Sequence, residues 1–284
     1  MKYYNNGNDI CVIVVFYNPT HSQVANFEEL SHEGANVIIV DNSKSALNIT
    51  PDSLYIPLRE NKGIATAQNI GIRNAKEKGY KYIVFSDQDS VIQYDFLLSL
   101  LNEYHKIKEI DKTLGVLGPM IVDEKSDLVY KNHLEMSSRF GKVSHIISSG
   151  SIVETSIFET VGYFEDDLFI DLVDYEWCWR LRQYNRNVYM TRNVSLNHSI
   201  GNNYFKWLGI YFNISSPIRY YYQYRNSIWM LGRPYVPRSW KWKTIIRRVS
   251  EIFLLPFFSS QKCAVIKYIF RGIWDGLNHK THML

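Results

Sequence analysis

Short apolar runs alternate with segments of helical periodicity over roughly the first 115 residues of the chain. The run Ile10–Tyr17 is continuously apolar, as in a parallel strand that is buried on both faces. Similar runs follow at 35–43, 53–58 and 81–90, and the stretches between them repeat apolar residues every three or four positions. Pro57 favours an edge position for the third run. This alternation predicts βαβ units and a mostly parallel sheet.

The pattern changes after Gly115, where strand-like segments with short breaks predict an antiparallel or mixed portion. Apolar residues at 173, 177, 181 and 184 predict a helix with one apolar stripe. The segment 187–198 is expected to be the last strand, and the chain reads as helical from Ser216. The expected fold is therefore α/β, with a Rossmann-like, mainly parallel mixed sheet and a C-terminal helical extension. We expect a catalytic domain over 1–215, with halves that meet near 115, and a helical region over 216–284.

Composition limits the compartment and the class of protein. The chain has 284 residues and three widely spaced cysteines, which is neither a disulfide framework nor a zinc pattern. The N-terminus lacks the apolar core of a signal peptide, and no apolar run approaches the ~20 residues of a spanning helix. We therefore expect a cytoplasmic protein that is soluble or bound peripherally to the inner face of the cell membrane.

Charge is distributed unevenly along the chain. The segment 233–284 carries a balance of +8 and the remainder −4, which together give the net charge of +4. Two stretches of this segment, 244–253 and 261–274, place apolar residues on one helical face and basic residues on another. Such helices suit an anionic membrane surface, but packing on the catalytic domain or a homo-oligomer interface explains them equally well. A nucleic-acid partner is not expected.

Two aspartates separated by one residue, Asp87 and Asp89, end the strand-like run VFSDQDS. Side chains at i and i+2 of an extended chain point to the same side, so negative charge is concentrated there. A turn or a helix N-cap also accounts for this spacing. The spacing fails as an EF-hand, and neither a P-loop nor a Rossmann glycine fingerprint is present. The remaining functional interpretation is a Mg²⁺ or Mn²⁺ site with a phosphate as co-ligand.

Polar residues also follow the other strands. Asp41 and Asn42 end the second run, where an aspartate can accept from a base N–H or a ribose hydroxyl, although a plain turn is the simpler explanation. Asn61, Lys62 and Gly63 precede a helix whose first N–H groups could meet a pyrophosphate, or could form an ordinary helix start.

Several segments, taken together and in sequence order, resemble those of a known family. In sequence order these are VVFYNP, VIIVDNS, NKGIATAQNIGI and FSDQDS, followed by SSGSIV, GYFEDDLFIDLVDYEWCWR and LNHSIG. The first group is similar to the nucleotide-binding half of the GT-A glycosyltransferases of family 2. The second group resembles the bacterial rhamnosyltransferases of that family, which use a dTDP-linked deoxysugar. The resemblance covers roughly residues 9–230 and implies the GT-A fold.

The resemblance assigns the donor site by position. Asp41 would bind the base, with Tyr17 and Asn18 in the same pocket. The matching residues near the diphosphate would be Asn61 and Gly63.

The same resemblance assigns the metal site, and the chemistry of the reaction adds a cation at the diphosphate. Asp89 would ligate the metal directly and Asp87 would lie nearer the ribose. His198 would complete the metal or diphosphate site, with a surface-loop histidine as the alternative. Lys62 would stabilise charge on the diphosphate.

Asp174 would match the general base of the family's Glu-Asp element. The sequence departs from that element, because Val173 stands where the family has glutamate. Asp171 lies one turn earlier and could share the helix face, whereas Glu176 should not. The alternative for all three acids is a charged helix surface.

The resemblance implies an inverting glycosyltransferase that moves a sugar, expected to be L-rhamnose from dTDP-rhamnose. The acceptor would be a saccharide in cell-surface polysaccharide synthesis such as O-antigen assembly, with a polyprenyl-linked carrier left open. Two alternatives stay open at this point. One is a haloacid-dehalogenase-like phosphatase with Asp87 as the nucleophile, and the other is a non-catalytic carbohydrate-binding relative.

Overall fold

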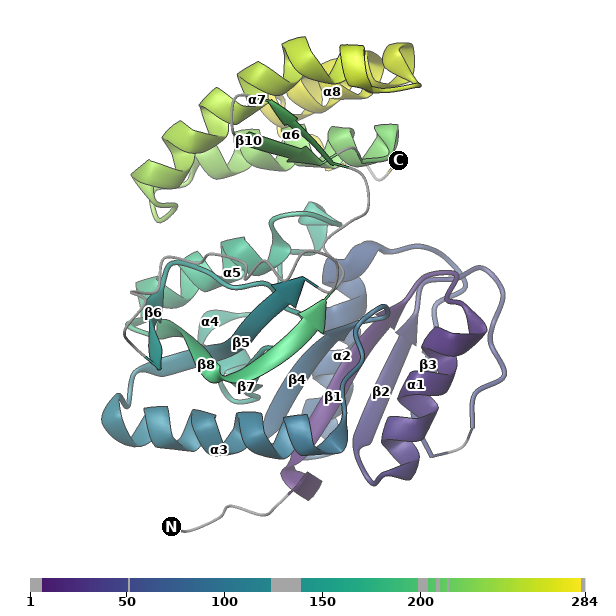
Figure 1. The fold of residues 1–284 in the computed structure, drawn as a ribbon, viewed down its shortest axis with the longest axis vertical. Helices are drawn as coiled ribbons and strands as arrows, with labels where there is room; N and C mark the ends of the chain where they lie inside the picture. The colour runs from purple at the N-terminus through teal and green to yellow at the C-terminus, as the bar shows by residue number, and fades with distance from the viewer. Residues whose placement is uncertain are drawn as a thin grey trace.

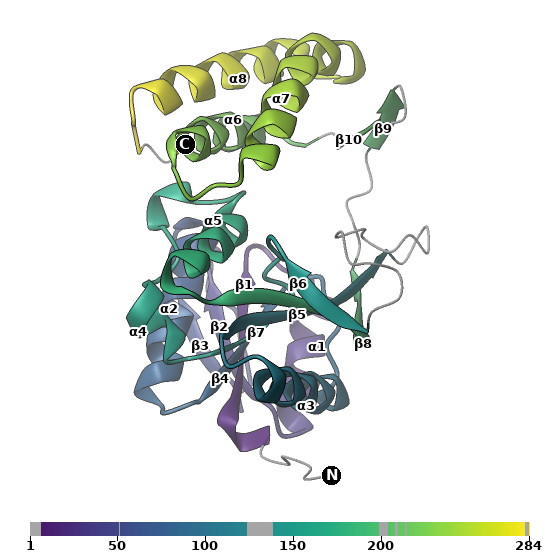
Figure 2. The ribbon, with the colours of Figure 1, turned by 90° about the vertical axis from the view of Figure 1, so that its left-hand side faces the viewer.

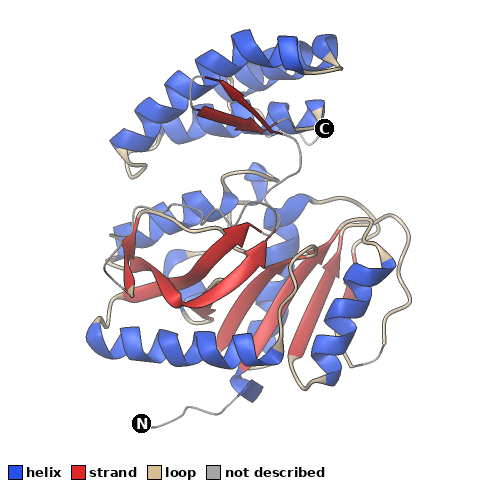
Figure 3. Cartoon of the chain, viewed as in Figure 1, coloured by secondary structure: helices blue, strands red, loops and turns tan. Residues whose placement is uncertain are grey.

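The computed structural model describes residues 7–50, 52–123, 139–198, 204–207, 210–213, 215–281 and 284. A mixed sheet lies between two layers of helices, and three further helices lie above one end of it (Figure 1). Colouring by secondary structure separates the sheet from this upper helical layer (Figure 3).

The main sheet has eight strands in the order β3-β2-β1-β4-β7-β5-β8-β6. The first four strands are parallel to one another. Strand β7 is antiparallel to both of its neighbours, β4 and β5. Strand β8 runs parallel to β5 and antiparallel to β6. The expected mixed sheet and the edge position of the strand with Pro57 are confirmed. The strands are β1 (Ile10–Phe16), β2 (Asn36–Asp41), β3 (Leu54–Pro57), β4 (Tyr82–Asp87), β5 (Leu114–Asp123), β6 (Phe140–Val143), β7 (Ile152–Glu154) and β8 (Asn187–His198).

Two apolar clusters, one on each face of the sheet, explain the continuous apolar runs. Neighbouring residues of β1 point to opposite faces, so Ile13 joins one cluster and Val14 the other. Helices α1 (His21–His32) and α3 (Tyr94–Ile110) cover one face. Helices α2 (Gly63–Glu77), α4 (Ile157–Val161) and α5 (Val173–Leu181) cover the other.

The structure corrects two of the elements predicted from the sequence, one helix end and the last strand. Tyr184 was expected on the apolar stripe of α5, but that helix ends at Leu181 and Tyr184 lies exposed in a 3₁₀ turn, η3 (Arg182–Tyr184). β8 was expected to be the last strand, but a hairpin of β9 (Tyr204–Trp207) and β10 (Ile210–Asn213) follows it. The remaining short helices are η1 (Gly7–Asp9) and η2 (Asp166–Leu168).

The C-terminal segment forms three helices, α6 (Pro217–Gly232), α7 (Arg238–Phe258) and α8 (Lys262–Leu277). Pro217 stands at the start of α6, where its missing N–H costs no hydrogen bond. Figure 2 shows α8 on the far side of α6 from the sheet and α7 crossing beside α6, and Trp240 at the start of α7 packs against Trp179 of α5. Tyr224 donates from its hydroxyl to the Arg248 carbonyl, which ties α6 to α7. The boundary at 215 matches the start of these helices, while a division into two domains stays a prediction.

An exposed apolar stripe runs along the outer helices. On α7 it repeats at three- and four-residue intervals, which places its members on one face, and α8 carries a second stripe. The buried side of α7 instead contains Glu251, which pairs with Arg247 and Arg248. The expected apolar faces are therefore divided, because Leu255, Val265 and Ile269 are buried against α6, whereas the residues named below are exposed. We call this surface the apolar stripe, and its members are Trp242, Ile246, Val249, Phe253, Phe257, Ile266, Phe270, Trp274 and Leu277.

Among the residues that the structure describes, no helix is both long and apolar enough to cross a membrane.

Candidate active site

A cavity of about 720 Å³ opens at the carboxyl ends of the parallel strands. Its walls come from the ends of β1 and β4, the start of α2, the segment before α5, and the helices α6 and α7. Ligands of open α/β sheets bind at this edge, and the volume is typical of a small-molecule site. The polar side chains that line it are Tyr17, Asn42, Asn61, Gln68, Asp87, Gln88, Asp89, Ser148, Asp171, Asp174, Tyr175, Ser215, Arg219, Gln223, Arg247 and Arg248.

The register between β1 and β4 explains how the first wall of the cavity forms. Val15 of β1 lies opposite Asp87 of β4, so the loops after both strands meet. The Tyr17 amide donates to the Gln88 side chain over 2.7 Å, which joins the two loops. Asp87 and Asp89 therefore lie at the cavity together with the half-exposed ring of Tyr17.

A tight loop before α2 forms the next part of this wall. The Asn42 side chain accepts from the Lys62 amide over 3.0 Å and donates to the Gly63 carbonyl over 3.2 Å. Gly63 has a φ of 80°, and a Cβ there would lie 2.5 Å from the Phe169 ring. Only glycine fits this backbone and this contact, which explains the residue that the sequence singled out. Asn61 lines the cavity beside it.

Three predicted donor residues are not among the lining residues of the cavity. Asp41 is fully buried, and its carboxylate accepts from the Ser43 amide and the Tyr55 hydroxyl. Asn18 has a φ of 47° and donates its amide to the Ser43 hydroxyl. Lys62 pairs with Glu60 at 2.9 Å on the surface. They adjoin the lining residues but are not part of it, so their contact with a ligand stays a prediction.

Asp174 lies on the opposite wall, at the start of α5. Its carboxylate accepts from the Tyr175 amide over 2.8 Å and from the Ser148 amide over 3.2 Å. Burial, assisted by the negative charge of Asp87, raises the pKa of Asp174 from an ordinary 3.8 to about 7. A carboxylate whose pKa lies near neutral pH is suited to accept a proton.

The two neighbouring acids are placed differently. Glu176 is buried and pairs with Arg180 at 2.9 Å and with Arg233 at 3.3 Å, so it faces the core, away from the cavity. Asp171 lines the cavity but forms a bidentate pair with Arg219, at 2.9 and 3.0 Å. Because Glu176 faces the core and Asp171 is paired with Arg219, Asp174 is the acid of this group best placed to act as a base.

The third wall, from α6 and α7, is the part that sequence reasoning did not assign. Arg219, Gln223, Arg247 and Arg248 line the cavity there. The density of stacking and charged residues in RYYYQYRN (219–226) was the available signal, and it left the choice between cleft and core open. Both occur, since Arg219 and Gln223 face the cavity whereas the tyrosines and the last two residues are buried.

The acid pair supplies two candidate metal ligands. Asp87 and Asp89 both line the cavity, and their hard oxygens suit Mg²⁺ or Mn²⁺. Within the described part of the chain no group of three or more histidine, cysteine or acidic side chains could hold a metal ion. His198 ends β8, where its backbone pairs with that of Asp123, but its side chain lies outside the described residues.

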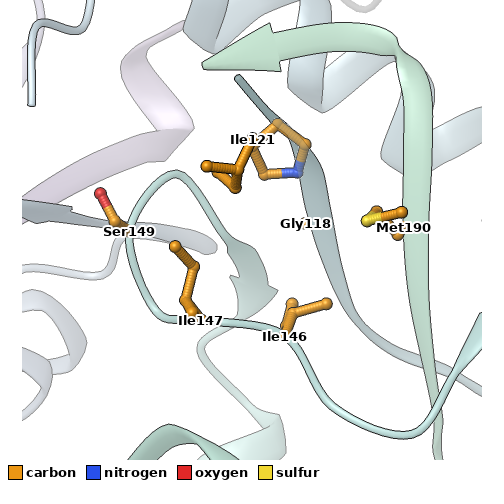
Figure 4. Close-up of a pocket in the computed structure, with 7 residues that line it drawn as sticks. Gly118, Ile121, Ile146, Ile147, Ser149 and Met190 are labelled. Atoms are coloured by element: carbon orange, nitrogen blue, oxygen red, sulfur yellow. The ribbon is translucent and has the colours of Figure 1, made fainter. Parts of the chain in front are cut away.

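A second cavity adjoins the large one between β5, β8 and the segment before β7 (Figure 4). Its volume is about 10 Å³, room for a single water molecule. Apolar side chains such as Ile146 and Met190 surround it, so it is a packing defect too small for a substrate.

Two solved structures share this fold with the chain. The chain matches Staphylococcus aureus TarS 1–349 in complex with UDP-GlcNAc with a TM-score of 0.56 and 12% identity, over 95% of this chain and 80% of that one. It matches GalNAc-T7 with UDP, GalNAc and Mn²⁺ with a TM-score of 0.53 and 13% identity, over 95% of this chain and 57% of that one. The fold is thus GT-A, a class in which the strand ends form the active site.

Sequence comparison gives the family. Residues 11–162 match the model of Glycosyl transferase family 2. The dTDP-rhamnosyl transferase RfbF of Shigella flexneri is 34% identical over 287 residues, which cover 96% of this chain and 97% of the relative. The poly-beta-1,6-N-acetyl-D-glucosamine synthase of Staphylococcus aureus (strain COL) is 22% identical over 62% of this chain and 46% of its own length. The chain belongs to glycosyl transferase family 2, and it is a glycosyltransferase. This membership decides against the phosphatase alternative for Asp87.

Proposed function

We propose that the chain is an inverting transferase that moves L-rhamnose from dTDP-rhamnose to a saccharide acceptor. The observation that carries this proposal is the 34% identity to a dTDP-rhamnosyl transferase over nearly the whole of both chains. The cavity supports the same reaction class, because it combines an acid pair on one wall with a separate acid of raised pKa on another. The proposed setting is the synthesis of a cell-surface polysaccharide such as an O-antigen.

The donor nucleotide is assigned to the wall formed by β1, β4 and the start of α2. The half-exposed ring of Tyr17 offers a stacking face for the base. Asp87 is assigned to the ribose, and Asn61 and Gly63 to the diphosphate. Asp41 and Asn18 both bond to Ser43 and hold this wall from behind. Lys62 can leave its exposed pair with Glu60 at little cost and turn to the diphosphate.

A divalent cation fits the donor set beside this wall. Asp89 is assigned as the direct ligand, and His198 as a further group of the same site. Carboxylate oxygens and the oxygens of a diphosphate together form the ligand set that Mg²⁺ and Mn²⁺ prefer. When bound, such a cation neutralises charge on the departing diphosphate.

Asp174 is assigned as the general base. The amides of Tyr175 and Ser148 fix the orientation of its carboxylate. The carboxylate accepts the proton of the acceptor hydroxyl while that oxygen bonds to the anomeric carbon and the bond to the diphosphate breaks. One displacement from the side opposite the leaving group inverts the anomeric centre. The acid pair and Asp174 hold separate positions, so neither can replace the other.

A nucleotide panel tests the donor assignment. Thermal unfolding is measured with dTDP, UDP, GDP and ADP, each with Mn²⁺ and with a chelator. A ligand that binds only the folded state raises its stability by about 2.7 kcal/mol at one hundred times its dissociation constant. We expect the largest rise with dTDP and Mn²⁺, and loss of most of it in Asp89→Asn. Equal shifts for every nucleotide, or a dTDP shift that the chelator leaves unchanged, would contradict the assignment.

The surface of α7 and α8 supports a second proposal, which concerns the protein's location. Glu251 and Asp275, the two acids of 233–284, are both buried and paired with basic side chains. The exposed charges around the apolar stripe are therefore basic, for example Lys243 and Lys267. An apolar stripe with basic flanks and exposed tryptophans is complementary to an anionic phospholipid surface. We propose that this surface binds the inner face of the cell membrane, where a polyprenyl-linked acceptor would be found.

Vesicle sedimentation tests this second proposal. The protein is mixed with vesicles of pure phosphatidylcholine or with vesicles that contain phosphatidylglycerol, and Phe253→Ser/Phe270→Ser is compared with the wild type. We expect binding to the anionic vesicles, loss of that binding in the double variant, and unchanged donor affinity. A stripe that instead joins two copies of the chain would give a dimer in solution that the same substitutions dissociate, without vesicle binding.

A further inference from the structure

The segment between η2 and α5 has an unusual backbone. Phe169, Asp171 and Leu172 all have positive φ, at 62°, 65° and 65°. Phe169 has a ψ of −65°, and the Ile170 amide donates to the Leu168 carbonyl, which together define a strained γ-turn. Each such non-glycine residue costs on the order of 1–3 kcal/mol and persists only where surrounding contacts enforce it. We call Phe169–Leu172 the strained turn.

The strained turn belongs to the active site. All four of its residues line the cavity, and Asp174 follows it two residues later at the start of α5. The Phe169 carbonyl also accepts from the Ile64 and Ala65 amides, at 2.7 and 3.3 Å, so the turn contacts the start of α2. The conformation of this turn therefore fixes the position of the proposed base.

Two buried side chains of α6 hold the turn. Asn226 is fully buried, and its amide nitrogen lies 2.9, 2.8 and 3.0 Å from the carbonyl oxygens of Leu168, Ile170 and Asp171. Arg225 is equally buried and donates to the Leu168 carbonyl over 3.2 Å and to the Asn226 side-chain oxygen over 3.0 Å. These contacts satisfy carbonyl groups that an unusual backbone would otherwise leave buried without partners.

Further contacts from the same helix flank these two residues. The Phe169 ring stacks on Tyr222 with ring centroids 4.6 Å apart, and Arg219 pairs with Asp171. The same contacts are explained if α6 has to hold the base in place.

We propose that Asn226 and Arg225 are positioning residues for transfer, and that α6 is an integral part of the catalytic unit. They stabilise the strained turn in the conformation that presents the Asp174 carboxylate to the cavity. The inference rests on the proposed role of Asp174, and it extends that role to residues that touch neither donor nor acceptor.

The experiment compares Asn226→Leu and Arg225→Lys with a matched control on the same helix. Tyr224→Phe removes a buried hydrogen bond from α6 to α7 and leaves the strained turn untouched. Donor affinity is measured by calorimetry with dTDP and Mn²⁺, and kcat by transfer or donor hydrolysis. Misplacing a catalytic group by about 1 Å can lower the rate by about 100-fold. We expect kcat to fall 10- to 100-fold in Asn226→Leu, and less in Arg225→Lys, with dTDP affinity changed less than about threefold.

The controls separate this inference from the proposed function. If Asp174→Asn keeps its transfer activity, the assignment of the base fails, whatever the α6 variants do. If Asp174→Asn is inactive while Asn226→Leu and Arg225→Lys keep the kcat of the wild type, the positioning role alone is overturned. A loss of kcat in Tyr224→Phe equal to that in the two test variants would show general destabilisation instead. Arg225→Lys keeps the buried charge, so it provides the test if Asn226→Leu does not fold.

Discussion

Replacing Asp174 with asparagine should change stability in opposite directions at high and low pH. Burial and the charge of Asp87 raise the pKa of this carboxyl to about 7 in the folded chain, against an ordinary 3.8. The folded state thus holds the proton more tightly than the unfolded state. The contribution of the Asp174 carboxyl to the free energy of unfolding is therefore present at low pH and is lost as pH rises toward 7.

The size of the effect follows from that difference. A gap of about 3 between the two pKa values corresponds to about 4 kcal/mol at pH 8, an upper limit because part of the side chain remains exposed. Asparagine carries no charge to desolvate, but it can accept from only one of the Tyr175 and Ser148 amides. The lost bond costs on the order of 2 kcal/mol. Asp174→Asn should therefore stabilise the protein by about 2 kcal/mol at pH 8 and destabilise it by a similar amount at pH 4.

Thermal unfolding without nucleotide or divalent cation, at half-unit steps from pH 4 to pH 8.5, measures this crossover. Each kcal/mol corresponds to a shift of about 2–4 °C in Tm for a chain of this size. Asp167→Asn, which removes an exposed acid just before the strained turn, controls for the loss of one negative charge. A difference between Asp174→Asn and the wild type that stays constant over the whole pH range would refute the reasoning. Transfer should fall by about 10²–10⁴ at every pH, as for the loss of a general base.

Three further predictions concern the same cavity. The kcat/KM of the wild type, which reports the free enzyme, should rise with pH through an acidic limb near 7, because Asp174 must lose its proton to act as a base, and a flat profile from pH 5 to 8 would contradict this. Gly63→Ala should lower the free energy of unfolding by about 1–3 kcal/mol in urea titrations, because the new Cβ meets Phe169 and φ is 80°. The control is Gly79→Ala, where φ is 81° but no atom lies near the new Cβ, and it should lower the free energy of unfolding by less. Asp89→Asn should lower Mn²⁺-dependent dTDP affinity at least tenfold by calorimetry while leaving metal-free affinity unchanged, and equal losses with and without Mn²⁺ would speak against a metal ligand.

The sequence predicted the donor half of the fold well because its signals are local. A run buried on both faces, such as Ile10–Phe16, must be apolar throughout, and Gly63 is required by its own backbone. Strand register then brings the loops after β1 and β4 together without further information. The residues expected to face a ligand at these strand ends, Tyr17 and Asp87, do line the cavity.

The opposite wall depended on long-range packing that no local pattern reveals. Arg247 and Arg248 line the cavity because the buried Glu251 pairs with both on the inner side of α7, which no local pattern of apolar residues indicates. The role of Asn226 depends on the carbonyl groups of a turn some 55 positions earlier in the chain. The β9–β10 hairpin was not predicted because its strands have four residues each, too few for an alternating pattern to distinguish them.

The most direct test of the account is to follow dTDP-rhamnose by proton NMR in the presence of the protein and Mn²⁺, with water or a saccharide as acceptor. The account predicts release of dTDP and a first-formed sugar whose anomeric configuration is opposite to that of the donor, with both signals lost in Asp174→Asn. A product that retains the donor's configuration, or the same rate of dTDP release in Asp174→Asn, would contradict it.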